Sequence, residues 1–140
     1  MTQDPLEQLL RLRRTAVDEA RRGLAECLRM ESETSATVTA IDVAIQREME
    51  VASSLTGGDA EVEAFAAWLR RIRPKQQAAL AAAAEAETAT ARTRIVLAAA
   101  RAAVRAVEET LEKRAAAEHA AAERRAQGEI DEVAGRSSAS

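Results

Sequence analysis

Aromatic residues are almost missing from this sequence, which contains one Phe, one Trp and no Tyr among its 140 residues. Aromatic side chains supply much of the buried area of an ordinary globular core, whereas alanine, the main apolar residue here, buries little. The composition therefore excludes a thick globular core. A chain rich in Ala, Glu, Arg and Leu and poor in Gly and Pro is typical of long helices that meet along a thin seam.

Cysteine and histidine each occur once, as Cys27 and His119. One cysteine excludes an internal disulfide, and neither residue has metal ligands at a suitable spacing. A Ser-His-Asp or Cys-His set is missing, as is a glycine-rich loop that ends in Lys-Ser/Thr. Glu108 and Glu109 are adjacent on a helix and point in different directions. We therefore expect no catalytic residue, no metal and no cofactor, and we do not expect an enzyme.

Neither sign of charge is in excess, because 20 Lys and Arg face 23 Asp and Glu, for a net charge of −3. This balance argues against nucleic acid or an anionic membrane as the partner. No uncharged apolar run reaches the roughly eighteen residues that span a bilayer. The N-terminus carries Asp4 and Glu7 and no apolar segment follows it, so we expect no signal peptide and a cytoplasmic protein.

The clearest break is Thr56-Gly57-Gly58-Asp59. Glycine allows the positive φ angles of a chain reversal, so we expect a turn over 56–59 between helices over 5–55 and 60–133. Asp4 and Asp59 are suited to cap the two helices, and Pro5 is suited to a first helical position. We predict an all-α fold in which residues 1–134 form a single antiparallel two-helix coiled-coil hairpin, followed by a disordered tail over 135–140.

Large apolar residues recur with a heptad period in both helices, far more often than the two in seven expected by chance. The first stripe has its a positions at Leu10, Val17, Leu24, Glu31, Val38, Ile45 and Ala52, and its d positions at Leu6, Arg13, Ala20, Cys27, Thr34, Ile41, Glu48 and Leu55. The second has Val62, Leu69, Leu97, Val104 and Leu111 at a, and Phe65, Ile72, Ala79, Ala86, Ala100 and Val107 at d. Polar flaws interrupt the first stripe at Arg13, Glu31, Thr34 and Glu48.

A chain that folds back around Gly57 and Gly58 brings together residues whose numbers add to about 115. Pro74 removes a helical hydrogen bond, so we expect a kink near Ile72 or a helix that restarts there. The large apolar residues stop after Leu111 and return only at Ile130 and Val133. The second helix is thus longer than the first, and its end is either a frayed helix or a surface for a partner.

Two groups of side chains are candidate contact surfaces. Trp68 lies one residue before a seam position, so we expect it to be half exposed, where it either covers the seam or anchors a partner. The expected register also gathers arginines: Arg11, Arg13, Arg14, Arg21 and Arg22 beside Arg92, Arg94, Arg101 and Arg105. Pairing with Asp18, Glu19, Glu26 and Glu108 is expected to neutralise half or more of them. A charge at the seam position Arg13 requires a partner or water.

Leu6-Glu7-Gln8-Leu9-Leu10-Arg11-Leu12-Arg13, followed by Asp18-Glu19-Ala20 and Leu24-Ala25, resembles the opening of the flagellar type III export protein family FliJ. Phe65, Leu69, Gln76 and Leu80, spaced four, seven and four apart, are similar to that family's segment after the hairpin turn. The length and the longer second helix are similar too, whereas Trp68, Pro74 and the high alanine content differ from the family pattern.

The resemblance implies a stalk component of the flagellar export apparatus that binds the hexameric export ATPase, promotes its activity and links it to the membrane export gate. It assigns ATPase contact to an arginine surface, which consists of Arg11, Arg13, Arg14, Arg101 and Arg105. It assigns contact with the gate's cytoplasmic domain to a corner surface, to which we add the neighbouring Trp68: Phe65, Trp68, Leu69, Gln76 and Leu80. Export chaperones are a further candidate partner, and the expected location is peripheral to the inner membrane through protein partners.

Two other interpretations stay open. One is the corresponding stalk of a virulence-type secretion system, which has the same fold and different clients. The other is a generic coiled-coil adaptor or a homodimer in which the seam forms between chains.

Overall fold

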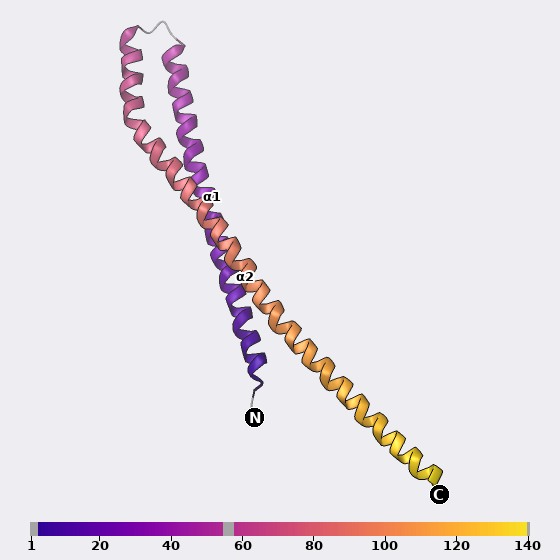
Figure 1. The fold of residues 1–140 in the computed structure, drawn as a ribbon. Coiled ribbons are helices and arrows are strands. Elements are labelled where there is room, and N and C mark those ends of the chain that lie inside the picture. The colour runs from indigo at the N-terminus through magenta and orange to yellow at the C-terminus, as the bar shows by residue number, and fades with distance from the viewer. Residues whose placement is uncertain (1–2, 55–57, 140) are drawn as a thin grey trace. The chain divides into compact units, whose positions relative to one another are not determined.

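The computed structural model describes residues 3–54 and 58–139, which form two helices and, within these ranges, no strand. Helix α1 (Pro5–Ser53) has 49 residues and helix α2 (Asp59–Ala139) has 81. The predicted reversal at Thr56 and Gly57 lies outside the described residues. The predicted all-α hairpin with a longer second helix is confirmed (Figure 1).

The start of α1 is capped as the sequence indicates. Asp4 Oδ1 accepts a hydrogen bond of 3.0 Å from the backbone N–H of Leu6, and the carbonyl of Asp4 accepts one from Gln8. Pro5 is the first helical residue, where its missing N–H removes no helical bond. Asp59, expected to precede α2 as its cap, is instead the first residue of that helix, and the carbonyl of Gly58 accepts a bond from Glu61.

The chain divides into two compact units, each of which contains a segment of both helices. Unit 1 comprises the described residues 3–17 and 99–139, and unit 2 comprises 18–54 and 58–98. In unit 1, Asp4 pairs with Arg114 and Arg14 with Glu108. In unit 2, Cys27 contacts Thr93 and Asp42 contacts Gln76. Because the residue number on α2 falls as that on α1 rises, the helices run antiparallel within each unit.

The heptad positions predict which residues are shielded from solvent. All the predicted a positions of α1 are buried or half-buried, and so are the predicted d positions of α2. Among the d positions of α1 and the a positions of α2 that the structure describes, three residues are exposed: Arg13, Glu48 and Val62. Arg13 and Glu48 were predicted flaws in the seam, and that prediction is wrong, because their long charged side chains turn to solvent instead. Glu31 and Thr34 are half-buried, so these two flaws do lie in the seam.

The core is as thin as the composition indicates. The buried residues are small or medium in size: Val17, Ala20, Ala79, Ala86, Thr90, Leu97 and Val107. Thr90 is the most buried of them, and its hydroxyl donates a hydrogen bond to the carbonyl of Ala86 at 3.0 Å. Its polar atom is therefore satisfied within its own helix.

The register differs from the predicted one. In unit 2, Thr93 lies between Gly23 and Cys27: its hydroxyl is 3.3 Å from Cys27 Sγ, and its methyl would lie 3.7 Å from a Cβ at Gly23. The numbers of Asp42 and Gln76 add to 118, as do those of Asp4 and Arg114. The numbers of Cys27 and Thr93 add to 120, and those of Arg14 and Glu108 add to 122. The partner of a given α1 residue thus lies about three to seven residues further along α2 than a reversal centred on the two glycines predicts. Heptad patterns fix which face packs, but they leave the sliding of one face along the other open.

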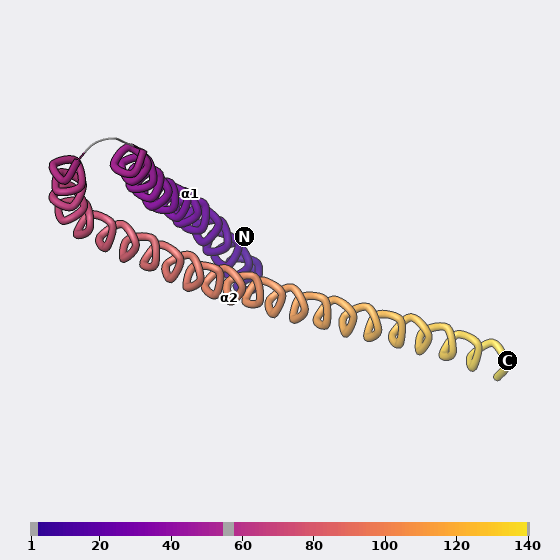
Figure 2. The backbone as a smooth tube through the Cα atoms, turned by 90° about the horizontal axis from the view of Figure 1, so that it is seen from above, coloured from indigo at the N-terminus to yellow at the C-terminus, as the bar shows by residue number. Residues whose placement is uncertain are grey.

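Pro74 lies inside α2, which continues through it as one helix. The helix therefore does not restart there, and the alternative expectation of a kink holds. Figures 1 and 2 both show α2 bending in its pink segment, which includes Pro74. Proline causes such bends because it lacks an N–H and its ring clashes with the preceding turn.

The end of α2 was predicted at residue 133, with a disordered tail after it, and this is wrong for the described residues. The helix continues to Ala139, and Ser140 lies outside the described residues. Gly135 does not stop it, because nearby side chains support the last turns. Arg136 pairs with Glu132 at 2.6 Å, and Gln127 donates to Asp131 at 2.9 Å.

Candidate contact surfaces

The aromatic pair of the corner surface lies on α2 in unit 2. The rings of Phe65 and Trp68 stack, with centroids 6.2 Å apart and an angle of 25° between their planes. Both side chains are half-buried, so the prediction that Trp68 is half exposed is confirmed. Stacking fixes the Trp68 ring beside the seam and leaves part of it accessible, which is the arrangement of an aromatic anchor at an interface.

A groove of about 310 Å³ lies beside this pair, between the end of α1 and the beginning of α2. We call it the corner groove. It is lined by Glu48, Val51, Ala52, Glu61, Ala64, Phe65 and Trp68. Its walls are mainly apolar, and Val51 remains 61% exposed. The carboxylates of Glu48 and Glu61 stand in the same lining, and neither has a cationic partner among the residues that the structure describes.

The other members of the corner surface differ in exposure. Leu69 is half-buried at a predicted seam position, and Gln76, seven residues later, is half-buried too. Gln76 is engaged, since its amide donates to Asp42 on α1 at 3.3 Å and its oxygen accepts a bond from Arg73. Leu80 is 45% exposed and is the member whose replacement disturbs packing least. The corner surface therefore combines residues that hold the two helices together with residues that face solvent.

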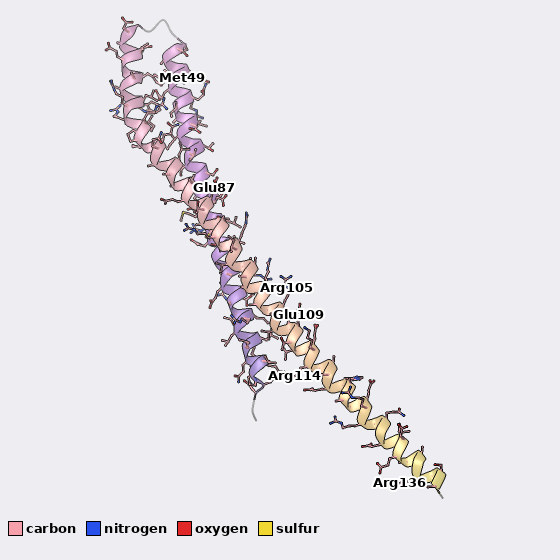
Figure 3. The ribbon with its side chains drawn as sticks, viewed as in Figure 1. Met49, Glu87, Arg105, Glu109, Arg114 and Arg136 are labelled. Carbon is pink, nitrogen blue, oxygen red and sulfur yellow. The ribbon has the colours of Figure 1, made fainter. Side chains whose placement is uncertain are left out.

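The arginine surface lies within unit 1, and all five of its members are exposed. Arg14 pairs with Glu108 across the helices at 3.5 Å. The other four have no carboxylate partner among the described residues: Arg11, Arg13, Arg101 and Arg105. Figure 3 marks Arg105 on α2, together with Glu109 and Arg114. Unpaired guanidinium groups on a helix surface are suited to bind carboxylates or phosphates of a partner.

Pairing was expected to neutralise half or more of the nine clustered arginines, and this is wrong within the described residues. Only two of them have a carboxylate within 4.0 Å: Arg14, with Glu108, and Arg21, with Asp18. Glu26 pairs with Arg29 instead, which lies one turn along its own helix. Two residues three apart on one helix are neighbours whatever the register of the two helices, so Glu26 pairs locally rather than with an arginine across the seam.

Asp4 and Arg114 form a cross-helix contact that the sequence pattern does not reveal. The hydrogen bond from Arg114, with a smaller contribution from the backbone N–H of Leu6, lowers the pKa of the Asp4 carboxyl below its usual 3.8. Asp4 thus caps α1 and tethers it to α2 at the same time. The sequence pattern does not reveal the contact with Arg114, because the two residues are far apart in the sequence and meet only in the register that the structure has.

The part of the chain that the structure describes contains no cluster of three or more His, Cys, Asp or Glu side chains suited to a metal ion. Over the same residues, neither helix has a stretch that is both long and apolar enough to cross a membrane. Comparison of the chain with family models, with curated proteins and with solved structures gives no match. The resemblance to the FliJ family therefore stays a prediction.

The sequence reasoning missed the acidic lining of the corner groove. Residues 47–63 contain Glu48, Glu50, Asp59, Glu61 and Glu63 against the single base Arg47. That excess of acid around the turn, close to the only Phe and Trp, was the available signal. It was overlooked because Glu48 was predicted to lie in the seam.

Proposed function

We propose that this chain is a stalk of the flagellar type III protein export apparatus, which binds the hexameric export ATPase and the cytoplasmic domain of the export gate. The arginine surface of unit 1 contacts the ATPase and promotes its activity. The corner surface of unit 2 contacts the gate. The protein then acts in the cytoplasm, peripheral to the inner membrane, and export chaperones are a further class of partner.

The observation that supports this proposal most is that the two surfaces expected from the FliJ resemblance are each gathered within one unit and differ in chemistry. Five exposed arginines lie in unit 1, four of them unpaired among the described residues. A stacked, half-buried aromatic pair beside an apolar groove lies in unit 2. A protein that joins two partners requires two such surfaces.

The first experiment titrates the cognate export ATPase with this protein and follows ATP hydrolysis and hexamer formation. We expect stimulated turnover together with assembly. Arg101→Ala with Arg105→Ala removes two unpaired charges and should reduce the stimulation several-fold at low salt through weaker binding, and the difference from the wild type should shrink as the salt concentration rises. Arg124→Ala with Arg125→Ala removes the same charge from an exposed part of α2 and serves as the control. Equal loss in both variants, or no stimulation by the wild type, would argue against the ATPase contact.

The second experiment measures binding to the gate's cytoplasmic domain. Phe65→Ala with Leu69→Ala should weaken binding, and circular dichroism must show helicity close to that of the wild type. A large loss of helicity would show that these two residues act in the seam alone. Leu80→Ser reduces this ambiguity, because Leu80 is 45% exposed, and should weaken gate binding with little change in helicity.

The stalk of a virulence-type secretion system would have the same two surfaces, and testing both ATPases side by side separates the two systems. A generic adaptor or homodimer is favoured by a different observation. Ile130 and Val133 are 62% and 64% exposed and line a shallow depression on α2 with Ala126 and Glu129. The mass of the protein in solution distinguishes this alternative, which requires a stable complex with a partner or a homodimer in which the seam forms between chains.

A further inference from the structure

We propose that the corner groove and the face of α2 that leads away from it bind an amphipathic helix of the partner, one whose apolar anchor lies between a basic end and an acidic end. This inference rests on the proposed function in placing a partner at the corner surface. It adds the chemistry of that partner and the order of its charges. The inference is based on the order of charges along α2 and on the corner groove.

One face of α2 contains five residues at spacings of three, four, three and four. They are Glu61, Ala64, Trp68, Arg71 and Lys75. These spacings keep the side chains within about a quarter of the helix circumference. Because α2 is continuous through Pro74, this face extends over about 21 Å from Glu61 to Lys75. The face therefore has the length of a partner helix of about four turns.

The charges on this face change sign at Trp68. Glu61 lies before it, and the corner groove adds Glu48 from α1 on the same side. Arg71 and Lys75 lie after it. All four charged side chains are exposed, and none has an ion-pair or hydrogen-bond partner among the described residues. Their charges are thus available to a partner, in the order acid, aromatic, base.

The partner's features follow by complementarity. A large apolar side chain fills the groove against Phe65 and Trp68, where burial of an aromatic face contributes most of the binding free energy. A Lys or Arg of the partner lies near Glu48 and Glu61, and an Asp or Glu lies near Arg71 and Lys75. Exposed pairs each contribute little to affinity, so the charges chiefly select the partner and its direction.

The test uses three synthetic peptides of about eighteen residues with the same apolar face and different ends: one basic and one acidic end, two acidic ends, or two basic ends. Trp68 is the only Trp, so its fluorescence reports binding at this surface alone. At low salt the mixed peptide should bind about threefold to tenfold more tightly than the other two, and 0.5 M salt should remove the difference. Equal binding of the three peptides, or no binding, would overturn the inference.

Two protein variants should change the order of affinities. Glu48→Lys with Glu61→Lys makes this surface basic throughout, so the peptide with two acidic ends should become the tightest. Arg71→Glu with Lys75→Glu makes it acidic throughout, so the peptide with two basic ends should become the tightest. Glu109→Lys with Glu112→Lys, at two exposed sites on α2 in unit 1, makes the same charge change and should leave the wild-type order unaltered. An unaltered order in the first two variants contradicts the inference.

The outcome is separable from that of the proposed function. Binding of the gate domain with no preference among the peptides overturns this inference and leaves the proposed function in place. The expected order of peptides, with no response of either the gate domain or the ATPase, supports this inference and overturns the proposed function.

Discussion

Unit 2 and unit 1 hold segments of the same two helices together by different means. In unit 2 the contact consists of small buried side chains, among them Ala79, Ala86 and Thr90, with Leu97 as the largest. In unit 1 the buried residues are Val17 and Val107, and two cross-helix ion pairs flank them. Because exposed ion pairs contribute little to stability, we infer that unit 1 opens more readily than unit 2.

The difference also separates the two candidate surfaces. The corner surface shares Phe65, Leu69 and Gln76 with the packing of unit 2, so binding and folding are linked there. The arginine surface consists of exposed side chains in unit 1, so its charges are replaceable at little cost to the fold. Substitutions that alter packing should therefore affect unit 2 most, and changes of salt or pH should affect unit 1 most.

The largest effect on stability is expected for Leu97→Ala in unit 2. Leu97 is 5% exposed, and removing a buried leucine side chain costs about 2–4 kcal/mol. Thermal unfolding followed by circular dichroism should show a clear fall in midpoint. Ile95→Ala is the control, since Ile95 is 70% exposed and its loss should cost no more than about 0.5 kcal/mol. Similar midpoints for the two variants would contradict the assignment of the seam.

A smaller effect of opposite sign is expected for Glu31→Leu. One carboxylate oxygen of Glu31 is buried and has no hydrogen-bond partner among the described residues. Replacing it with leucine removes that cost and adds apolar contact, for a gain of about 1 kcal/mol. Denaturant unfolding measures the change. Glu19→Leu, at an exposed position of the same helix, should not stabilise the protein. A gain of equal size there would contradict the explanation that the unpaired Glu31 oxygen is what costs stability.

The ion pair between Arg14 and Glu108 should contribute about 0.5 kcal/mol or less to unit 1. Its side chains are 3.5 Å apart and both are substantially exposed. A double-mutant cycle with Arg14→Ala and Glu108→Ala measures the coupling at low and at high salt. A coupling well above 1 kcal/mol would mean that ion pairs stabilise unit 1 strongly, and would contradict the inference that unit 1 opens more readily than unit 2.

The smallest effect is the pH response of Asp4. Its folded-state pKa lies below the unfolded value, so its stabilising contribution is fully present above about pH 4 and is lost as the pH falls through the folded pKa. Carboxyl carbon NMR should place the Asp4 midpoint below 3.8, and Arg114→Gln should move it back toward that value. An unchanged midpoint in the variant would show that the backbone cap of Leu6 alone causes the shift.

The sequence was sufficient to predict the two helices, the capping by Asp4 and nearly all seam positions, because heptad spacing and capping chemistry are local properties. Arg13 and Glu48 were assigned to the seam by spacing alone, and their long side chains reach solvent from those positions. The register was missed by about three to seven residues, because repeated alanines offer little resistance to sliding. The Asp4–Arg114 contact depends on that register and was not predictable, whereas the excess of acid over residues 47–63 was a sequence signal for the lining of the corner groove.

The most direct test of the structure is a cysteine cross-link between α1 and α2, because both candidate surfaces depend on the pairing and register of these helices within one chain. Cys27 is the only cysteine, and Thr93 faces it at 3.3 Å. Thr93→Cys should oxidise rapidly to an intramolecular disulfide in a monomer, whereas Thr88→Cys, the partner of Cys27 in the register predicted from the turn, should not. A disulfide-linked dimer, or faster oxidation at position 88, would contradict the structure and favour a seam that forms between chains or in another register.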